Sequence, residues 1–550
     1  MTVPTRPSPL LSPEPRMRGR RRRRHGLAWL LTAGLVILLA GAGAVWVWSG
    51  ATISADATAL ARVAVQPFGG RLVGATAFGP DGRPIPLRAQ SGRLTPGVQL
   101  RPGEQVTVVA VVRRPGWLAW AIGRQHEERL TLHTPVARVT QRWLTVPAGS
   151  AARVHFDQPV SAVAARAGGQ PHFLALRGQR RSISLPRRAA AGSIELAIAT
   201  RPWERLGRTI VVSWFPPART PVLVSSPAPG APLTPAAPIR LTLSKPLTTV
   251  LGSSLPRLSP RTPGHWRQLD SHTLVFEPSG FGPGLSTDLH LRLPQTVAIS
   301  YARGNGLSTT SMLTWSVQPG SLLRLQQLLA QAGYLPLTWQ AAGLSVARTP
   351  SAELRAAINP PNGRFSWRYP NIPPELRALW TAGQPNQISR GAVMLFEHDH
   401  ALAVDGLPGH RVWHALLADA IAAKRNTSGY SYVYVHSSIP QSLTLWHDGQ
   451  TILTSPGNTG VPAAPTQLGT FPVFEHIPVG TMSGTNPDGS HYHDPGIRYI
   501  SYFNGGDAIH AFNRSSFGTP QSLGCVELPL AAAARVWPYT PIGTLVTIEG

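Results

Sequence analysis

The only cysteine among the 550 residues, Cys525, follows His510 by fifteen positions. A thiol has an ordinary pKa of about 8.5, so it needs a nearby base or positive charge to act as a nucleophile at neutral pH. Histidine titrates near neutrality and can serve as that base. The alternative is structural, with Cys525 as a small buried apolar residue and His510 as a hydrogen-bonded core histidine.

The flanking residues predict that the pair meets in space. Ala508 and Ile509 precede the histidine, and Val526 and Leu528 follow the cysteine, as expected of two strand ends. The polar loop between them contains turn residues, so it can fold back and bring the two side chains together; these residues are Gly518, Pro520 and Gly524.

Several ordered motifs around this pair resemble the L,D-transpeptidase (YkuD-like) catalytic domain. That family's signature is a histidine, a loop and then Ser/Thr-His-Gly-Cys, and the matching residues here are His510, Ser522, Gly524 and Cys525. The family's TG…TPxGTF strand-turn-strand is matched upstream by Thr459-Gly460, Pro465-Thr466 and Leu468-Gly469-Thr470-Phe471, and its histidine strand by 504–510. The resemblance covers about 429–550.

The chain departs from the family pattern at a few positions. Leu523 stands where the signature has a second histidine, and Glu527 stands where Asn or Arg is common. Ala511 and Phe512 replace the small residues that often follow the first histidine. These departures put the oxyanion and substrate contacts in question, whereas the nucleophile and the base are retained.

The resemblance implies acyl transfer on peptidoglycan stem peptides. Cys525 is the expected nucleophile and His510 the expected base, with a backbone carbonyl expected on the other imidazole nitrogen to fix its tautomer. Gly524, Ser522 and Ala511 are the expected substrate or oxyanion contacts, and a purely structural turn role for Ser522 stays open. An amine on a neighbouring stem then resolves the thioester and forms a cross-link. This chemistry needs no metal and no cofactor.

Two other functions stay open. Water in place of an amine would make the protein a carboxypeptidase-like hydrolase with the same Cys-His pair. Alternatively, the catalytic fold has decayed and the protein is a non-enzymatic wall tether, a reading that Leu523 and Glu527 favour.

The N-terminus predicts a membrane anchor. Residues 1–26 form a basic, Arg-rich tail, and 27–48 carry no charge over 22 residues, enough to span about 30 Å of hydrocarbon as a helix. Trp29, Trp46 and Trp48 lie near the ends of this span, as interfacial anchors do. We expect the tail in the cytoplasm and the remainder outside, in the cell wall. A cleaved signal peptide is the alternative.

The fold expected for the whole chain is multidomain and mainly β. Apolar residues alternate with polar ones between Pro- and Gly-rich turns, for example at Val106, Val108, Ala110 and Val112. Proline clusters divide this part into three β-sandwich modules that resemble immunoglobulin-like repeats, over 51–133, 134–217 and 218–318. Their expected role is to hold the C-terminal part away from the membrane.

Residues 319–425 change to helical periodicity and resemble a peptidoglycan-binding helical domain. The best evidence is a GLxVDGxxG-like stretch that includes Asp405-Gly406 and Pro408-Gly409. Three helices are predicted, one ending at Gly333, one starting at Pro374 and one over 412–421. Residues 335–387 read as an insertion.

The last region, 429–550, is predicted to open with a hairpin turning at Asp448-Gly449. Residues 480–496 read as a long polar loop beside the substrate cleft. His491, His493 and Asp494 in that loop are a possible zinc set, but the Cys-His pair already supplies a complete metal-free chemistry.

The formal net charge of +26 comes mostly from arginine. Because no nucleic-acid module is recognisable, we expect stem peptides, glycan and anionic envelope polymers as partners, and no nucleic acid. The alternative is that the high arginine content is a compositional bias and does not indicate an anionic partner. A single cysteine rules out an internal disulfide.

Overall fold

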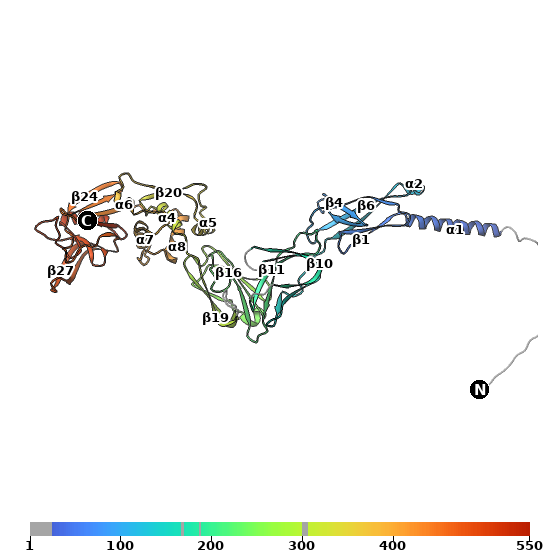
Figure 1. Ribbon diagram of the computed structural model, residues 1–550, viewed down its shortest axis with the longest axis horizontal. Coiled ribbons are helices and arrows are strands. Elements are labelled where there is room, and N and C mark those ends of the chain that lie inside the picture. Colours follow the sequence, from blue (N-terminus) through green and yellow to red (C-terminus); the bar gives the residue numbers. More distant parts are fainter. Residues whose placement is uncertain (1–24, 167–169, 186–188, 300–305) are drawn as a thin grey trace, which may run out of the picture. The chain divides into compact units, whose positions relative to one another are not determined.

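The computed structural model describes residues 25–166, 170–185, 189–299 and 306–550, and the chain is mainly β with few helices (Figure 1). It divides into two compact units. One holds the chain up to Leu144 with Ala151–Pro186 and Ser193–Val212, and the other holds Thr145–Ser150, Arg187–Gly192 and Ser213–Gly550. The predicted basic tail over 1–26 lies almost wholly outside the described residues.

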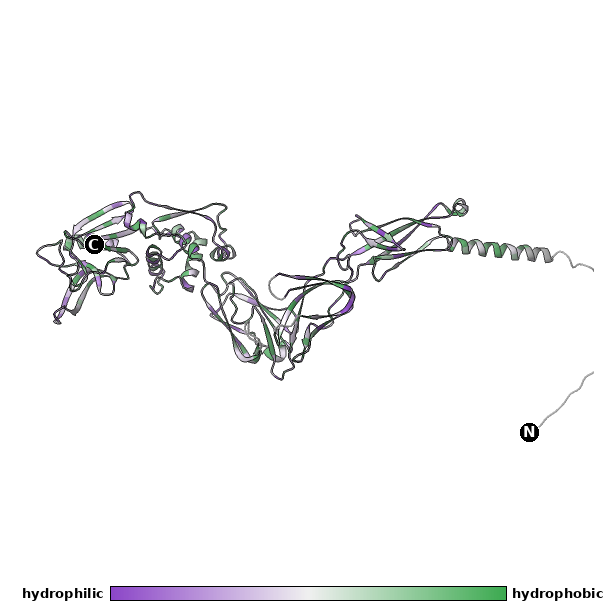
Figure 2. Cartoon of the chain, in the orientation of Figure 1, coloured by the Kyte–Doolittle hydropathy of each residue, from purple (hydrophilic) through white to green (hydrophobic). Residues whose placement is uncertain are grey.

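Helix α1 (His25–Val47) covers most of the predicted anchor. Large apolar side chains along it are exposed, among them Leu35, Ile37 and Leu38, and Figure 2 shows the apolar colouring over most of the helix. In the described part of the chain, no helix is both long and apolar enough to cross a membrane. The anchor over 27–48, which includes side chains outside the described set, therefore stays a prediction.

The first β module is a seven-stranded sheet in the order β1-β2-β5-β4-β3-β6-β7. Its elements are β1 (Ala51–Ala55), β2 (Ala61–Val65), β3 (Arg71–Phe78), β4 (Pro84–Gln90), β5 (Arg93–Pro96), β6 (Gln105–Arg113), α2 (Gly116–Ile122) and β7 (Gln125–His133). The alternation predicted in β6 is confirmed, since Val106, Val108, Ala110 and Val112 are all fully buried.

Two further sheets follow. The first has the order β10-β9-β11-β12-β8, from β8 (Trp143–Thr145), β9 (Ala152–Arg166), β10 (His172–Leu185), β11 (Gly192–Ala199) and β12 (Ile210–Phe215). The second has the order β15-β18-β13-β14-β17-β16 with β19 on β18, from β13 (Val222–Ser226), β14 (Ile239–Leu243), α3 (Leu247–Leu251), β15 (Arg257–Ser259), β16 (Gly264–Gln268), β17 (Thr273–Pro278), β18 (Asp288–Ile299) and β19 (Ser308–Ser316). The immunoglobulin-like resemblance stays a prediction.

The helical region contains α4 (Leu322–Gln331), β20 (Leu337–Ala341), α5 (Pro350–Ile358), β21 (Gly363–Trp367), α6 (Pro374–Ala378), α7 (Gln387–Asp399) and α8 (His410–Ala422). The three predicted helices are confirmed as α4, α6 and α8, and Gly333 just after α4 has a φ of 86°. The segment that read as an insertion is part of the region's core, because Leu337, Leu354 and Leu376 in it are buried with the helices.

The C-terminal region is built from two sheets. The first has the order β24-β23-β22-β30-β25, and the second β26-β27-β28-β29. Their elements are β22 (Ser431–His436), β23 (Ser442–His447), β24 (Gln450–Pro456), β25 (Gly469–Pro472), β26 (Glu475–Thr485), β27 (His491–Asn504), β28 (Asp507–Ala511), β29 (Val526–Leu528), α9 (Leu530–Val536), the 3-10 helix η1 (Trp537–Tyr539) and β30 (Leu545–Glu549). The two sheets share one apolar core, and the hairpin predicted at Asp448-Gly449 joins β23 to β24.

The prediction of a long polar loop over 480–496 is wrong. Strands β26 and β27 pair from Glu475↔Tyr502 to Thr485↔His491, so only 486–490 form the turn. The residues are polar because this hairpin is largely exposed on both faces, and an exposed two-stranded arm lacks the hydrophobic alternation that signals a strand.

The helical region and the C-terminal region share a hydrophobic core. Trp413 and Leu416 of α8 are buried in one cluster with Tyr432, Trp446 and Leu545 of the first C-terminal sheet. The Trp446 indole nitrogen also donates to the Asn371 carbonyl oxygen at 3.0 Å. Burial of large aromatic side chains across this boundary fixes the C-terminal sheet against the helices.

We expect Gly391→Ala to destabilise this junction. Alanine favours a helix over glycine by about 1 kcal/mol, but a Cβ at 391 would lie 2.4 Å from the Gly543 carbonyl oxygen. Overpacking of this kind costs about 1–3 kcal/mol. Hydrogen exchange of amides in α7 and β30 measures the effect. The control is Gly343→Ala, whose Cβ meets nothing within 4 Å; slower exchange in Gly391→Ala would contradict the packing argument.

Candidate active site

Two short parallel strands, β28 and β29, carry the site. Their register pairs Ile509 with Val526 and His510 with Glu527. Ile509 and Val526 are buried in the core between the two sheets. Because side chains alternate along a strand, His510 and Glu527 face the opposite side, and Cys525, two residues before Glu527, shares that side. Parallel pairing thus brings together residues from the two ends of the loop, as predicted.

The His510 imidazole is buried and oriented by the backbone. The side chain is 3% exposed, and its Nδ1 lies 3.0 Å from the Ala511 carbonyl oxygen. A carbonyl only accepts, so Nδ1 carries the proton and Nε2 keeps a lone pair. Burial lowers the pKa of His510, which keeps the ring neutral near pH 7. The predicted backbone partner is therefore present, and Nε2 is free to accept a proton.

The Cys525 thiol is protonated at rest. Its sulfur lies 3.6 Å from the Gly506 carbonyl oxygen, to which it donates. Burial raises the pKa of the thiol to about 12, with the charges of Asp507 and Glu527 adding to the effect and the Ala508 N–H opposing it. Both the thiol and the imidazole are therefore neutral near pH 7.

The turn before Cys525 requires glycine and is held by Ser522. Gly524 has a φ of 117°, and a Cβ there would lie 2.2 Å from the Asp507 carboxylate. Ser522 is buried; its hydroxyl donates to the Cys525 carbonyl oxygen at 2.5 Å and accepts from the Gly524 N–H at 3.3 Å. Ser522 therefore orders the backbone of the turn that carries Cys525.

Asp507 is an acidic neighbour of the thiol that sequence reasoning missed. Its Oδ2 accepts from the Asn504 amide at 3.4 Å, and the backbone N–H of Gln467 also contacts the carboxyl group. Burial raises the pKa of Asp507. Its position in β28 was predicted, but its contact with Gly524 depends on the pairing of β28 with β29.

Glu527 is a buried carboxylate that forms an ion pair with the half-buried Arg514. The carboxylate is 3% exposed and is held by two charge-assisted bonds, from Nη2 at 2.7 Å and from Nε at 2.8 Å. The Arg514 guanidinium also donates to the Gln521 carbonyl oxygen at 3.0 Å and stacks over Phe512 at 4.6 Å. Arg514 was not singled out from the sequence, although an acidic residue at 527 calls for a cation nearby.

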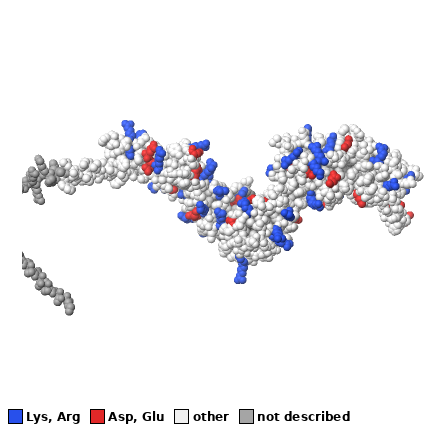
Figure 3. All heavy atoms as spheres, turned by 180° about the vertical axis from the view of Figure 1, so that it is seen from behind, with Lys and Arg blue, Asp and Glu red and all other residues white. Residues whose placement is uncertain are grey.

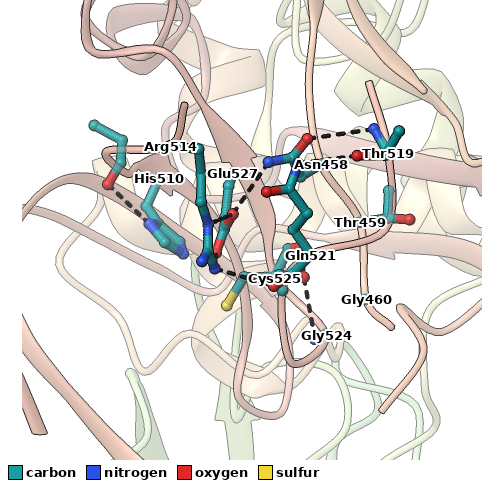
Figure 4. A network of polar contacts seen from close by, with 12 residues as sticks. Asn458, Thr459, Gly460, His510, Arg514, Thr519, Gln521, Gly524, Cys525 and Glu527 are labelled. Carbon is teal, nitrogen blue, oxygen red and sulfur yellow. Dashed lines mark hydrogen bonds and ion pairs between the residues drawn. The ribbon is translucent and has the colours of Figure 1, made fainter. Parts of the chain in front are cut away.

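A buried amide completes the network (Figure 4). Asn458 is fully buried, and its Oδ1 accepts from the N–H groups of Gly518 and Thr519 at 3.0 and 3.4 Å. Its backbone pairs with that of Glu527. The loop that joins His510 to Cys525 is therefore fixed at its centre as well as at its ends.

The TG…TP motif shapes the neighbouring loop. The Gly460 N–H donates to the Thr466 hydroxyl at 2.9 Å, and a Cβ at Gly460 would lie 2.2 Å from the Ala464 carbonyl oxygen. Thr459 in turn accepts from the Gln441 amide at 2.7 Å. These residues hold the backbone and do not point to a direct chemical role.

A cleft of about 780 Å³ opens beside the histidine strand. Its lining includes Asp494 and Ile497 from β27, Phe512 and Arg514 from the loop, and Leu530 from α9. Burial raises the pKa of Tyr492 and of Tyr502 in β27, and both lie near enough to Cys525 for a negative charge on its sulfur to raise their pKa values further. Cys525 and His510 are not among the lining residues, so the cleft adjoins the pair and does not contain it. Strand β27, part of which was predicted as a loop, lines the cleft.

Comparison with known proteins decides the family of this region. Residues 430–548 match the sequence profile of the L,D-transpeptidase catalytic domain, YkuD. The C-terminal domain is a YkuD L,D-transpeptidase catalytic domain. Among curated proteins, none matches the chain.

Solved structures of L,D-transpeptidases also resemble the chain. One from Mycobacterium smegmatis is 14% identical, covering 60% of this chain and 97% of its own, with a TM-score of 0.20. The catalytic domain of an L,D-transpeptidase from E. faecium is 24% identical, and the match covers 22% of this chain and 100% of that domain, with a TM-score of 0.20. The same domain acylated by ertapenem is 25% identical, and the match covers 22% of this chain and 98% of that domain, with a TM-score of 0.20. The assignment rests on the sequence profile and not on these low TM-scores.

The structure gives a physical account of one departure from the family pattern. In this L,D-transpeptidase domain, Glu527 is compensated by Arg514 and so is not an isolated buried charge. Leu523 is half-buried in the turn, and nothing in the structure explains its replacement of histidine.

Arg514→Met should strongly destabilise the L,D-transpeptidase domain, because it leaves Glu527 buried without a cation. Breaking a fully buried pair costs about 3–5 kcal/mol, and because Arg514 is 30% exposed the loss should lie toward the lower end, whereas replacing both partners by apolar residues is near neutral. Thermal unfolding should therefore show a large loss for Arg514→Met and substantial recovery in Arg514→Met with Glu527→Leu. The control is Arg535→Met, an exposed arginine of α9; equal losses in the two arginine variants would contradict the ion-pair argument.

Asp507→Asn should make the thiol more reactive. The Asp507 charge raises the pKa of Cys525, so its removal should lower that pKa and shift the pH profile of alkylation to lower pH. Well below the pKa, the thiolate fraction rises tenfold for each unit of decrease. Iodoacetamide labelling reports Cys525 alone, because it is the only cysteine. Asp488→Asn on the β26–β27 turn is the control, and an unchanged or raised midpoint in Asp507→Asn would refute the prediction.

Proposed function

We propose that the protein is a membrane-anchored L,D-transpeptidase that cross-links peptidoglycan stem peptides through a thioester on Cys525. The observation that carries the proposal is the placement of Cys525 and His510 on one face of the paired strands β28 and β29, within a domain of the YkuD family. A neutral imidazole with a free Nε2 can accept the proton that a neutral thiol must lose.

In the first half-reaction, His510 Nε2 takes the thiol proton as Cys525 Sγ attacks the carbonyl carbon of an L,D bond. The backbone N–H groups around Gly524 and Cys525 are the proposed donors to the tetrahedral oxyanion. The Gly524 N–H already contacts Ser522, so that donor has to shift from the hydroxyl to the oxyanion. The C–N bond then breaks, and the terminal D-residue leaves with the proton that His510 returns.

In the second half-reaction, an amine of a neighbouring stem attacks the thioester carbonyl. The new amide forms as the C–S bond breaks, and the amine proton passes through His510 back to the sulfur. Ser522 acts as a positioning residue for the turn, and Ala511 supplies the carbonyl that fixes the His510 tautomer. The Ala511 side chain itself is buried in the core between the two sheets, so its proposed contribution is through the backbone.

The same residues would serve a hydrolase in which water resolves the thioester, so product analysis with and without acceptor stems discriminates the two. The wall-tether alternative loses part of its support, because Glu527 is paired with Arg514. Leu523 remains its basis.

The location is part of the proposal. We place α1 in the membrane with the N-terminal tail in the cytoplasm, on the basis of the uncharged run 27–48 and its arginine-rich flank. The catalytic domain then lies in the cell wall, where glycan and anionic polymers are the proposed partners. On the face seen in Figure 3, Lys and Arg side chains are scattered along the chain, as suits diffuse attraction to an anionic polymer.

Intact-mass analysis with a stem tetrapeptide or a carbapenem should give a covalent adduct on the wild-type chain and none on Cys525→Ala. His510→Ala should acylate about 10²–10⁴-fold more slowly, the usual contribution of a general base. The control is His265→Ala, a surface histidine of β16, which should acylate as the wild type does. A folded wild-type protein that never acquires an adduct with either reagent would refute the enzyme proposal and leave the wall tether.

A further inference from the structure

Helix α1 is fixed to the first β module without a flexible spacer. It ends at Val47, and β1 begins at Ala51. Ser49 between them is fully buried, and backbone N–H groups of the β2–β3 turn donate to the Trp48 and Gly50 carbonyl oxygens, each at 3.1 Å. The direction in which α1 leaves the module is therefore set by hydrogen bonds.

A second element, α2 (Gly116–Ile122), is tied to the same junction. It forms the tip of the β6–β7 hairpin, and its sequence, GWLAWAI, contains no charged residue. Arg114 links the two elements, because its Nε donates to the Ser49 carbonyl oxygen at 3.0 Å and its Nη1 to the Ile122 carbonyl oxygen at 2.6 Å.

An apolar pocket of about 400 Å³ lies between α1 and α2. Leu118, Ala121 and Ile122 line it from α2, and residues from Ile37 to Trp46 line it from α1. Ile37 is ten residues from the end of α1, about 15 Å along the axis at 1.5 Å per residue. Helix α2 thus lies beside the last turns of α1, at the level of apolar side chains and not of a polar surface.

The outer surface of α2 presents indole rings to solvent. Trp120 is 86% exposed and Trp117 is 59% exposed. Trp46 and Trp48, near the end of α1, are also exposed, and Phe68 on the β2–β3 turn packs edge-on against Trp117. Tryptophan is the side chain most typical of membrane interfaces, because its ring is apolar and its N–H can bond to headgroups.

We propose that α2 is a second membrane element that inserts Trp117 and Trp120 into the extracytoplasmic leaflet beside α1. The occupant of this surface is lipid, because α2 is uncharged and its apolar surface is continuous with that of α1. Arg113 and Arg124 are exposed on either side of α2, where they would meet lipid phosphates. The proposal rests on the proposed anchor role of α1.

Insertion of both α1 and α2 would fix the orientation of the first β module relative to the bilayer, which α1 alone would not do. A single helix lets the attached module rotate about the helix axis, whereas a hairpin tip inserted beside it fixes one face of the module toward the membrane. Because the junction is hydrogen-bonded, that orientation passes directly to the first β module.

The test uses the full chain in vesicles of phosphatidylcholine and phosphatidylglycerol. In a Cys525→Ala background, single cysteines are introduced as Trp120→Cys, Trp117→Cys, Leu35→Cys on α1 and Phe173→Cys, and each is labelled with an environment-sensitive fluorophore. Phe173 of β10 is the matched control, an exposed aromatic outside the pocket between α1 and α2. Quenching by spin-labelled lipids is then compared among the four positions.

We expect lipid quenching at 120, 117 and 35 that is several-fold stronger than at 173. Quenching at 35 with water-exposed labels at 120 and 117 would overturn the proposal for α2, while the proposed membrane anchor α1 would be supported. Labels at 120 and 117 that are shielded from water but not quenched by lipid would also overturn it, since a second copy or another protein then covers the surface. No quenching at 35 would refute the anchor and this proposal together, while acylation of Cys525 in the wild-type chain tests the enzyme separately.

Discussion

The parallel pairing of β28 with β29 is the constraint on which the candidate active site depends. It aligns His510 with Glu527 and leaves Cys525 just before the strand, so three functional groups share one face while Ile509 and Val526 fill the core on the other. The same burial sets the chemistry, because it lowers the pKa of the imidazole and raises that of the thiol. Both groups are therefore neutral near pH 7.

Keeping that face in place requires several buried polar groups, and each has a partner. Ser522 orders the turn before the thiol, Asn458 fixes the centre of the loop, and Arg514 neutralises Glu527. Buried polar networks are stable only when their members are satisfied, and removal of one member exposes the desolvation cost of the others. The loop from His510 to Cys525 therefore behaves as one unit with the strands it joins.

A shared hydrophobic core and a set of hydrogen bonds also join neighbouring regions of the chain. The helical region and the L,D-transpeptidase domain bury Trp413, Trp446 and Leu545 in one core, so the helices pack directly on the first C-terminal sheet, and the sheet that carries the candidate site shares a second core with that sheet. At the other end, α1 joins the first β module through hydrogen bonds at Trp48, Ser49 and Gly50.

By itself, the sequence determined the residue types and the local patterns: the Cys525–His510 pair and its family, the buried alternation in β6, the helices α4, α6 and α8, and the strands that carry the pair. Such features depend on periodicity and on motif order, which are local. Tertiary structure decided the rest. The exposed β26–β27 arm lacks a hydrophobic signal, the Arg514–Glu527 pair and the Asp507–Gly524 contact cross between segments, and the protonation of both reacting groups depends on what covers them. Burial and pairing arise only when distant segments meet, so no stretch of sequence contains them alone.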